Sequence, residues 1–377
     1  MTEQLSTQQV LEALSRVEDP EIGRPITELD MIESVSIDGS DVSVGIYLTI
    51  AGCPMRETIH SNARAVLEEL NGVSSVDVHM HTMSDEQRRA LSQKLRGTQA
   101  TPSIPFADPD SRTRVFAVAS GKGGVGKSSM TVNLAVALAA EGLTVGVLDA
   151  DIYGHSVPGL LGSAGQAPTL VDDMIMPPIS HGVRHISVGQ FVDGNAPIVW
   201  RGPMLTRAIQ QFLSDVYWGD LDVLLLDLPP GTGDVAITVA QLIPNAQLIV
   251  VTTPQSAAAE VAERAGTISQ QTGQPIAGVI ENMSAMVLPD GTVLDVFGTG
   301  GGEAVAQRLS ALTDSADVEL LGSVPLDPRL RTHGDDGTPV VLSEPDSPSA
   351  RAIAAIAAKL KVRRSTLVGK SLGVSPR

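Results

Sequence analysis

The residues with the clearest chemical meaning are the eight consecutive ones at 121–128, which read GKGGVGKS. They match the pattern GxxxxGK[ST], a loop whose backbone N–H groups surround nucleotide phosphates. The apolar run 115–119 precedes the loop and predicts a buried strand, and the run 130–140 after it predicts a helix. The helix dipole adds partial positive charge where the phosphates would lie. We therefore predict that a nucleotide binds to the loop residues Gly121, Lys122, Gly123, Gly124, Val125, Gly126, Lys127 and Ser128.

Three residues of this loop have side chains suited to phosphate chemistry. Lys127 is expected to reach the β and γ phosphates, and the Ser128 hydroxyl is expected to ligate Mg²⁺. Lys122 is a second lysine at a position that tolerates many residue types. A solvated lysine is the default there, and Lys122 reaches phosphate only if the loop faces inward or a second subunit docks across it.

Acidic residues follow two further apolar runs. Asp149 and Asp151 come directly after the run 145–148, where they suit Mg²⁺ coordination through water and orientation of an attacking water, although acids at strand ends also cap turns. Asp227 closes the run 221–226 in the arrangement called Walker B, which holds the metal through a water. The sequence thus predicts a Mg²⁺ site at Ser128, Asp149 and Asp227. The loop 231–233 after it is a candidate switch.

Two isolated residues stand out beyond these motifs. Asn282 follows the apolar run 276–280 and is expected on the same rim, where its amide could hydrogen-bond an adenine edge or cap a turn. Cys53 is the single cysteine, and it follows a strand in the segment Ala-Gly-Cys-Pro. A lone cysteine is more often a small buried hydrophobe than a reactive group.

These residues require a sheet to bring them together. The apolar runs are continuous, as in strands that are covered on both faces, and helix-like segments lie between them. They occupy residues 115–119, 145–148, 223–226, 248–251, 276–280 and 318–321. We predict an α/β fold with a doubly wound, mostly parallel sheet, and a nucleotide at the carboxyl ends of its strands.

The chain before the first run has a different pattern. A helix at 7–16, a hairpin of 32–37 with 42–50, a helix at 56–70 and a strand at 73–80 predict a small α+β domain. We divide the chain into this domain at 1–96, a proline-containing linker at 97–112, a nucleotide-binding domain at 113–362 and a basic tail at 363–377.

Composition narrows the classes of function. The 377 residues are 42% hydrophobic and 18% charged, which is typical of a globular protein, and no apolar run is long enough to span a membrane. The N-terminus has no basic start followed by an apolar core, so we expect no secretion signal. One cysteine excludes an intramolecular disulfide framework and fits a cytoplasmic location. The net charge of −17 disfavours nucleic-acid binding.

The motifs resemble those of a known family. GKGGVGKS with its extra lysine is similar to the deviant Walker A group, which includes MinD, ParA and the nitrogenase iron protein. Within that group the chain resembles the Mrp (ApbC) ATPases, which bind and transfer iron–sulfur clusters. The residues that carry this resemblance lie at 149–154, 200–204, 226–234, 281–284, 297–301 and 325–328. Residues 1–95, with Asp19-Pro-Glu21 and Cys53-Pro54, resemble the small assembly domain that precedes many of these ATPases.

The resemblance implies a function and further roles for residues. It implies a cytoplasmic, Mg²⁺-dependent ATPase that carries iron–sulfur clusters to apoprotein clients, with ATP and Mg²⁺ as cofactors. Lys122 would contact phosphate across a nucleotide-sandwich homodimer, Asp151 would position the hydrolytic water, and Asn282 would recognise adenine.

The chain departs from the family pattern at the cluster site. Many members carry a CxxC pair soon after Glu-Asn-Met-Ser, whereas residues 283–291 contain no cysteine. Clusters are normally held by four thiolates, and a dimer of this chain offers two, both Cys53. An iron–sulfur cluster would therefore need Cys53 and ligands from outside.

Three alternative functions follow from the same residues. A nucleotide-switched scaffold or regulator without a cluster is one. A ParA-like positioning ATPase is disfavoured by the charge. A MinD-like one would need a membrane-binding C-terminal helix, but its face of Ile353, Ile356, Ala357 and Leu360 lacks an aromatic anchor, so we expect it to dock on the sheet.

Overall fold

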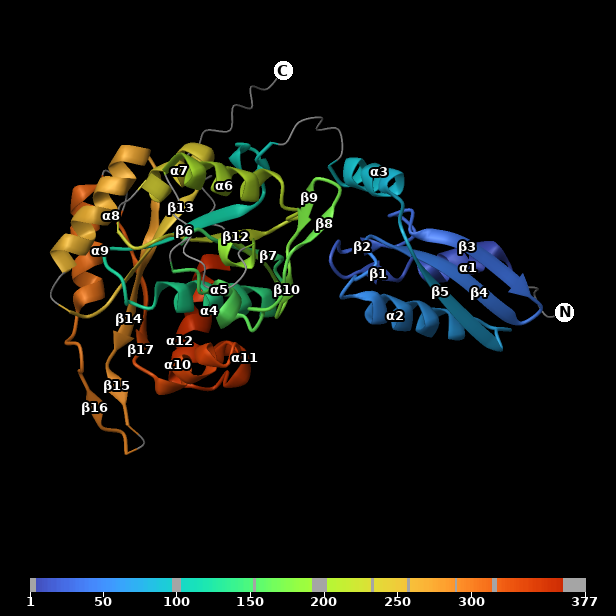
Figure 1. Cartoon of the computed structure of the whole chain (residues 1–377). Helices are drawn as coiled ribbons and strands as arrows, with labels where there is room; N and C mark the ends of the chain where they lie inside the picture. The colour runs from blue at the N-terminus through green and yellow to red at the C-terminus, as the bar shows by residue number, and fades with distance from the viewer. Residues whose placement is uncertain are drawn as a thin grey trace, which may run out of the picture.

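A computed structural model describes residues 5–96, 103–151, 154–191, 202–231, 234–255, 258–288, 290–313 and 317–361. The predicted basic tail at 363–377 and residues 232–233 of the predicted switch loop lie outside these ranges. The chain folds into a large unit around one broad sheet and a smaller N-terminal unit beside it (Figure 1).

The large unit is built on an eight-stranded sheet. Its strand order is β10-β11-β7-β12-β6-β13-β14-β17. All neighbouring pairs are parallel except β10 with β11. The four central strands are almost entirely buried, which is why each reads as a continuous apolar run. The strands are β6 (Arg114–Ser120), β7 (Val145–Asp149), β10 (Ile179–Ser180), β11 (Val183–Ser187), β12 (Val223–Asp227), β13 (Gln247–Thr252), β14 (Ile276–Ser284) and β17 (Leu320–Pro325).

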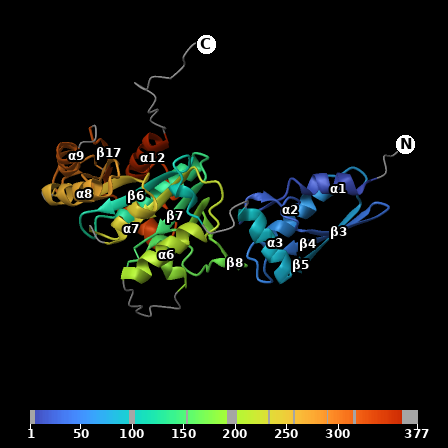
Figure 2. The same ribbon diagram turned by 90° about the horizontal axis from the view of Figure 1, so that it is seen from above.

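Helices cover both faces of this sheet, so the predicted doubly wound α/β fold is confirmed (Figures 1 and 2). One face packs against α4 (Lys127–Ala140), α5 (Val157–Leu160), α10 (Pro328–Asp335), α11 (Val340–Ser343) and α12 (Pro348–Lys361). The other packs against α6 (Gly202–Ser214), α7 (Asp234–Leu242), α8 (Ala258–Thr272) and α9 (Gly301–Leu312). A short hairpin of β15 (Met286–Val287) and β16 (Val293–Leu294) extends from the end of β14 (Figure 1).

The C-terminal helix α12 docks as the sequence predicts. Its apolar face is buried against β17 and α4, and the residues of that face are Ile353, Ile356, Ala357 and Leu360. Within the part of the chain that the structure describes, no helix has the length and apolar character needed to cross a bilayer.

The N-terminal unit has the predicted order of elements. The hairpin strands β3 and β4 pair antiparallel, and β5 then pairs parallel with β4. The first helix begins after Ser6, whose hydroxyl accepts a hydrogen bond from the backbone N–H of Gln9 in a capping box. The elements are α1 (Thr7–Leu14), β1 (Glu18–Asp19), β2 (Arg24–Pro25), β3 (Ile32–Asp38), β4 (Asp41–Leu48), α2 (Arg56–Glu68), β5 (Ser75–Thr82) and α3 (Asp85–Arg96).

The two units share a hydrophobic core. A hairpin of β8 (Thr169–Val171) and β9 (Met174–Met176) extends from the large unit and packs against α3. Its side chains Val171, Met174 and Met176 are buried in the same cluster as the core of the N-terminal unit. Figure 1 shows this hairpin between the large sheet and the smaller unit.

Part of the segment predicted as a linker is also packed. Residues Pro105–Ala107 form a 3₁₀ turn (η1), and its Phe106 is buried in the core of the large unit. The ring of Phe106 meets Trp218 edge to face, with 6.4 Å between the ring centroids.

Candidate functional site

The glycine loop lies between β6 and α4 at the carboxyl edge of the sheet. Gly124 and Gly126 have φ of 78° and 79°, a left-handed conformation that L side chains rarely adopt. A methyl group built at Gly124 would have no atom within 4 Å, so the space in front of the loop is open. The loop lines a cavity of about 280 Å³ that Asp151, Ser156 and Pro230 also line. This is a cradle of the shape that a polyphosphate needs.

Asp227, at the end of β12, binds polar side chains from the end of the loop and from the beginning of α4. Its Oδ1 lies 2.7 Å from the Lys127 Nζ, and its Oδ2 accepts a hydrogen bond of 2.6 Å from the Ser128 Oγ. The Thr131 hydroxyl donates to Oδ1 at 2.9 Å. Asp227 is 0% exposed, so this ion pair is shielded from water and strongly oriented. The structure therefore brings together the predicted residues Lys127, Ser128 and Asp227.

Asp149 lies beside Asp227 because their strands are adjacent and in register. It is 1% exposed, and burial, followed by the negative charge of Asp227, raises its pKa to about 7. Its Oδ2 accepts hydrogen bonds from the Ser187 hydroxyl at 3.1 Å and from the backbone N–H of Val157 at 3.3 Å. Two acids that share a buried site are a natural seat for a divalent cation.

Asp151 lines the same cavity, two residues beyond Asp149. Its backbone N–H donates to the Asp149 Oδ1 at 3.1 Å, and its own Oδ1 accepts from the Gly154 backbone at 3.0 Å. Asp149 therefore helps to fix the turn that presents Asp151 to the cavity.

Lys122 is placed differently from Lys127. Its Nζ donates a hydrogen bond of 2.5 Å to the Gln255 Oε1, and it is not among the residues that line the cavity. The neighbouring Gly121 carbonyl accepts a hydrogen bond of 2.5 Å from the Arg264 guanidinium of α8. The first part of the loop is thus held from the side by residues at and after the end of β13.

Asn282 contacts the glycine loop directly. Its Nδ2 donates to the Val125 carbonyl at 2.8 Å, and a methyl group at Gly126 would collide with that nitrogen. Asn282 is 2% exposed, yet its Oδ1 has no hydrogen-bond partner among the described residues. Asn282 therefore keeps one unsatisfied acceptor at the edge of the loop.

Cys53 belongs to the core of the N-terminal unit and not to this cavity. It is 6% exposed, its Sγ lies 3.9 Å from the Glu21 Oε2, and burial raises the pKa of the thiol to about 11. Burial and the charge of Asp19 also raise the pKa of Glu21 to about 7. Across the described ranges, no group of three or more His, Cys, Asp or Glu side chains is arranged to hold a metal ion.

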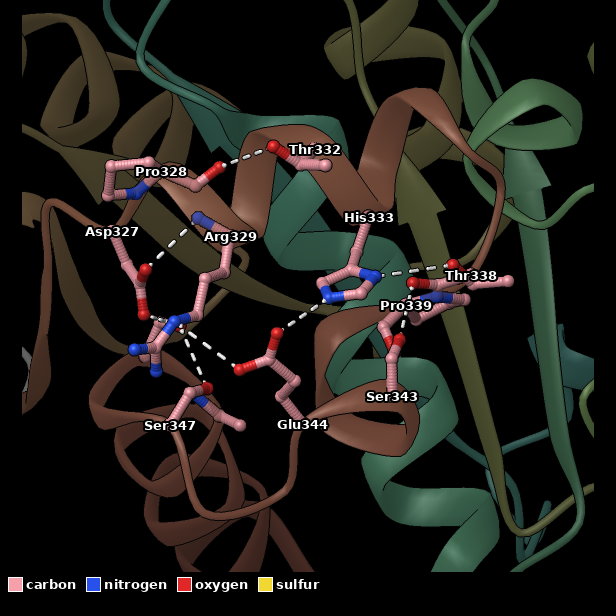
Figure 3. A network of polar contacts seen from close by, with 12 residues as sticks. Asp327, Pro328, Arg329, Thr332, His333, Thr338, Pro339, Ser343, Glu344 and Ser347 are labelled. Carbon is pink, nitrogen blue, oxygen red and sulfur yellow. Dashed lines mark hydrogen bonds and ion pairs between the residues drawn. The ribbon is translucent and has the colours of Figure 1, made fainter.

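A polar network supports the module of α10, α11 and α12 beside the site (Figure 3). Asp327 caps α10 and accepts a hydrogen bond of 2.8 Å from Ser349, which joins that helix to α12. Glu344 binds both Arg329, at 3.3 Å, and His333, at 3.1 Å. The same module packs on α4 and α5, so the network supports the helices that follow the glycine loop and Asp151.

Sequence reasoning missed several residues that hold the site. Thr131 lies four residues after Lys127, so the helical period could have placed it beside Asp227. Ser187, Gln255 and Arg264 are 38, 133 and 143 residues away from the groups they bind, and no local pattern marks them.

The fold and this loop define the class of P-loop nucleotide-binding proteins. Residues 111–361 match the family model described as NUBPL iron-transfer P-loop NTPase, and residues 7–79 match that of iron-sulfur cluster assembly proteins. The chain belongs to the NUBPL iron-transfer P-loop NTPase family, with an assembly-type domain in front of the NTPase domain. This confirms the resemblance drawn from the sequence.

Individual relatives agree with the family model. An iron-sulfur cluster carrier protein of Mycobacterium tuberculosis is 61% identical over 366 residues, which cover 97% of this chain and 95% of the relative. One from Escherichia coli is 37% identical over 337 residues, covering 89% and 86%. A nucleotide-binding protein from Archaeoglobus fulgidus, solved in complex with ADP, is 36% identical with a TM-score of 0.54, covering 62% of this chain and 89% of that one.

Proposed function

We propose that this protein hydrolyses ATP in a Mg²⁺-dependent reaction and carries iron–sulfur clusters to apoprotein clients as a homodimer. The observation that carries the proposal is the convergence of Lys127, Ser128 and Asp227 at an open glycine loop. The relatives named as cluster carriers support the choice of cargo.

The residues present fit both ATP and Mg²⁺. The backbone N–H groups of the loop and the Lys127 ammonium would bind the phosphates, because the loop is open on the side of the cavity. Ser128, Asp149 and Asp227 would hold Mg²⁺, which supplies charge neutralisation to the phosphate oxygens when bound. The oxygen-rich donor set suits this hard cation, and the two neighbouring acids lose their mutual repulsion when a cation is present.

Hydrolysis would depend on orientation of water by this chain. Asp151 lines the cavity, and its carboxylate would accept a hydrogen bond from the attacking water and hold it in line. Asp149 keeps the turn of Asp151 in place through the backbone N–H of that residue. Lys127 would hold the phosphate oxygens where negative charge develops.

Two further assignments concern the nucleotide and the partner subunit. Asn282 would accept a hydrogen bond from the adenine amino group, because its buried Oδ1 has an unused lone pair. Lys122 would leave Gln255 and contact phosphate across a homodimer interface, since its ammonium is outside its own cavity.

A second candidate function is a nucleotide-switched scaffold that carries no cluster. In the described parts of the chain, no three side chains are arranged to hold a metal ion, and this favours the scaffold. The buried thiol of Cys53, whose pKa is raised to about 11, favours the scaffold as well. Anaerobic reconstitution with iron and sulfide separates the two. Colour in the wild type that is lost in Cys53→Ala supports a cluster at Cys53, whereas absence of colour in both proteins favours the scaffold.

The ATPase proposal is tested with Lys127→Ala. We expect phosphate release to be abolished, because the variant removes the charge that neutralises phosphate. Lys359→Ala, which changes a lysine on the outer face of α12, is the matched control and should hydrolyse ATP like the wild type. EDTA should stop phosphate release in the wild type. Near-normal turnover in Lys127→Ala would refute the site.

A further inference from the structure

The turn between β1 and β2 of the N-terminal unit contacts the large sheet. A methyl group built at Gly23, in this turn, would lie 3.2 Å from the Arg184 Nη2 of β11. Tyr217, from the same region of the large unit, is buried in the core of the N-terminal unit. Figure 1 shows β1 and β2 on the side of the small unit that faces β8, β9 and β10. The turn is therefore part of the junction between the units.

The same turn shapes the surroundings of Cys53. Glu21 is its acidic neighbour, with 3.9 Å between the Sγ and Oε2 atoms. Asp19 is buried and accepts hydrogen bonds from the backbone N–H groups of Glu21 and Ile22 at 2.9 and 3.0 Å, which fixes the shape of the turn. A shift of the turn would therefore change how Cys53 is covered.

The other end of β11 reaches the nucleotide site. Ser187 lies three residues after Arg184, about 10 Å along the strand, and its hydroxyl binds the Asp149 Oδ2 at 3.1 Å. The strand pairs with β7 along its whole length, which links its two ends through one continuous ladder. One short strand thus contacts both the acid of the nucleotide site and the turn beside the thiol.

The side chain of Arg184 is sensitive to a movement of β11. Its Nε is buried, and among the described residues this nitrogen has no hydrogen-bond partner and the guanidinium forms no ion pair. An unsatisfied buried polar group is costly, so small movements that change its surroundings change its energy appreciably. The charged and titratable groups around this junction are Asp19 and Arg24 of the N-terminal unit and Tyr217 and Asp220 of the large unit.

We propose that β11 couples nucleotide binding to the exposure of Cys53, with Ser187 and Arg184 as the positioning residues at its two ends. The inference rests on the proposed nucleotide site. Mg²⁺ held by Asp149 would draw on the carboxylate to which Ser187 donates, and this would loosen the hydrogen bond at that end of β11. Arg184 then moves against Gly23, the turn of Asp19 and Glu21 opens, and the thiol becomes accessible.

The test uses the full chain, in which Cys53 is the single thiol. The rate of alkylation by iodoacetamide is measured with and without saturating Mg²⁺–ADP, and ADP affinity is measured by calorimetry on the same samples. We expect the nucleotide to raise the wild-type rate about fivefold or more, the lower end of ordinary coupling between sites. In Arg184→Met the rate should no longer respond, while ADP affinity stays within about twofold of the wild type.

Controls make the result specific. Arg351→Met places the same substitution on the exposed side of α12 and should retain the response. Arg184→Lys keeps the positive charge and replaces Arg184→Met if that variant does not fold; its response should be weakened, because lysine lacks the planar guanidinium. Coupling between two sites is reciprocal. Alkylated wild-type protein, in which the turn is open, should therefore bind ADP more tightly than the unmodified protein, by the same factor by which ADP favours the open turn.

Several outcomes would overturn the inference. A wild-type rate that is unchanged or lowered by bound ADP excludes the proposed coupling, as does a full response in Arg184→Met or in Arg184→Lys. Failure of the proposed nucleotide site itself would appear separately, as an absence of ADP binding in calorimetry of the wild type.

Discussion

The substitution Asp149→Asn makes the electrostatics of the site measurable. The Asp149 carboxyl is 1% exposed and lies beside the buried Asp227, so its ionised form is disfavoured and its pKa rises to about 7. Lys127, which pairs with Asp227, and the hydrogen bond from Ser187 oppose this rise only in part. Asparagine keeps the shape of the side chain and removes its charge. Both carboxylate oxygens accept hydrogen bonds, so asparagine also loses one acceptor at every pH, but the variant should gain stability relative to the wild type as the pH rises and the wild type must ionise.

The sign and size follow from proton binding. In the unfolded chain Asp149 titrates near 3.8, so between that pH and about 7 the folded protein binds one proton more than the unfolded chain. The free energy of unfolding of the wild type then falls as the pH rises, by about 1.4 kcal/mol per pH unit from this group. Over the whole window the loss amounts to about 4 kcal/mol. The stability difference between variant and wild type should grow by that amount and become constant above pH 7.

Urea unfolding in EDTA, without nucleotide, gives the measurement at pH 5, 6, 7 and 8. Tryptophan fluorescence reports the transition, because Trp218, one of the two tryptophans, is buried in the large unit. Asp336→Asn changes an exposed acid after α10 and serves as the matched control, which should follow the wild type at every pH. A difference between Asp149→Asn and the wild type that stays constant from pH 5 to 7, or that shrinks as the pH rises, would show that the carboxyl is not destabilised by its surroundings.

Three further substitutions test the loop, the chemistry and the junction. Gly126→Ala should lower ADP affinity at least about tenfold in calorimetry, because the residue has a φ of 79° and its new methyl group meets Asn282; Gly165→Ala, where a methyl group has open space, should not. Asp151→Asn should bind ATP normally but release phosphate much more slowly, and weakened binding with normal turnover would contradict its role. Met174→Ala should lower the free energy of urea unfolding by about 2–5 kcal/mol, since the side chain is buried in the core that both units share; a loss below about 1 kcal/mol would show that this contact contributes little.

The nucleotide loop and the central strands could be predicted because their signals are local. The loop 121–128 carries its chemistry in consecutive residues, and Lys127 begins its helix as the pattern requires. Asp149 and Asp227 each end a continuous apolar run, and parallel strands bring such ends to one edge of a sheet. The loop pattern and the position of the acids at strand ends are therefore enough to predict that Lys127, Ser128 and Asp227 lie close together.

The remaining contacts could not be predicted because they depend on pairings far apart in the sequence. Strand β11 contains an arginine and a histidine in five residues, so it lacks the apolar run that marks its neighbours. Its Ser187 meets Asp149 only because β11 is added at the edge of β7. The sequence of the hairpin β8–β9 likewise carries no local signal of this packing. Its methionines are buried because the hairpin packs on the N-terminal unit.

The single thiol sets a condition on any iron–sulfur cargo. A thiolate is the form that binds iron, and the pKa of Cys53, raised by burial to about 11, leaves almost none at neutral pH. Two such residues in a dimer are half of the usual four ligands. For Cys53 to hold a cluster, the turn beside Glu21 would have to uncover the thiol, and further ligands would have to come from outside the chain. That turn lies against Arg184 of β11, and Ser187 of the same strand binds Asp149 of the neighbouring β7, so the proposed coupling would let the nucleotide site control when the thiol is available.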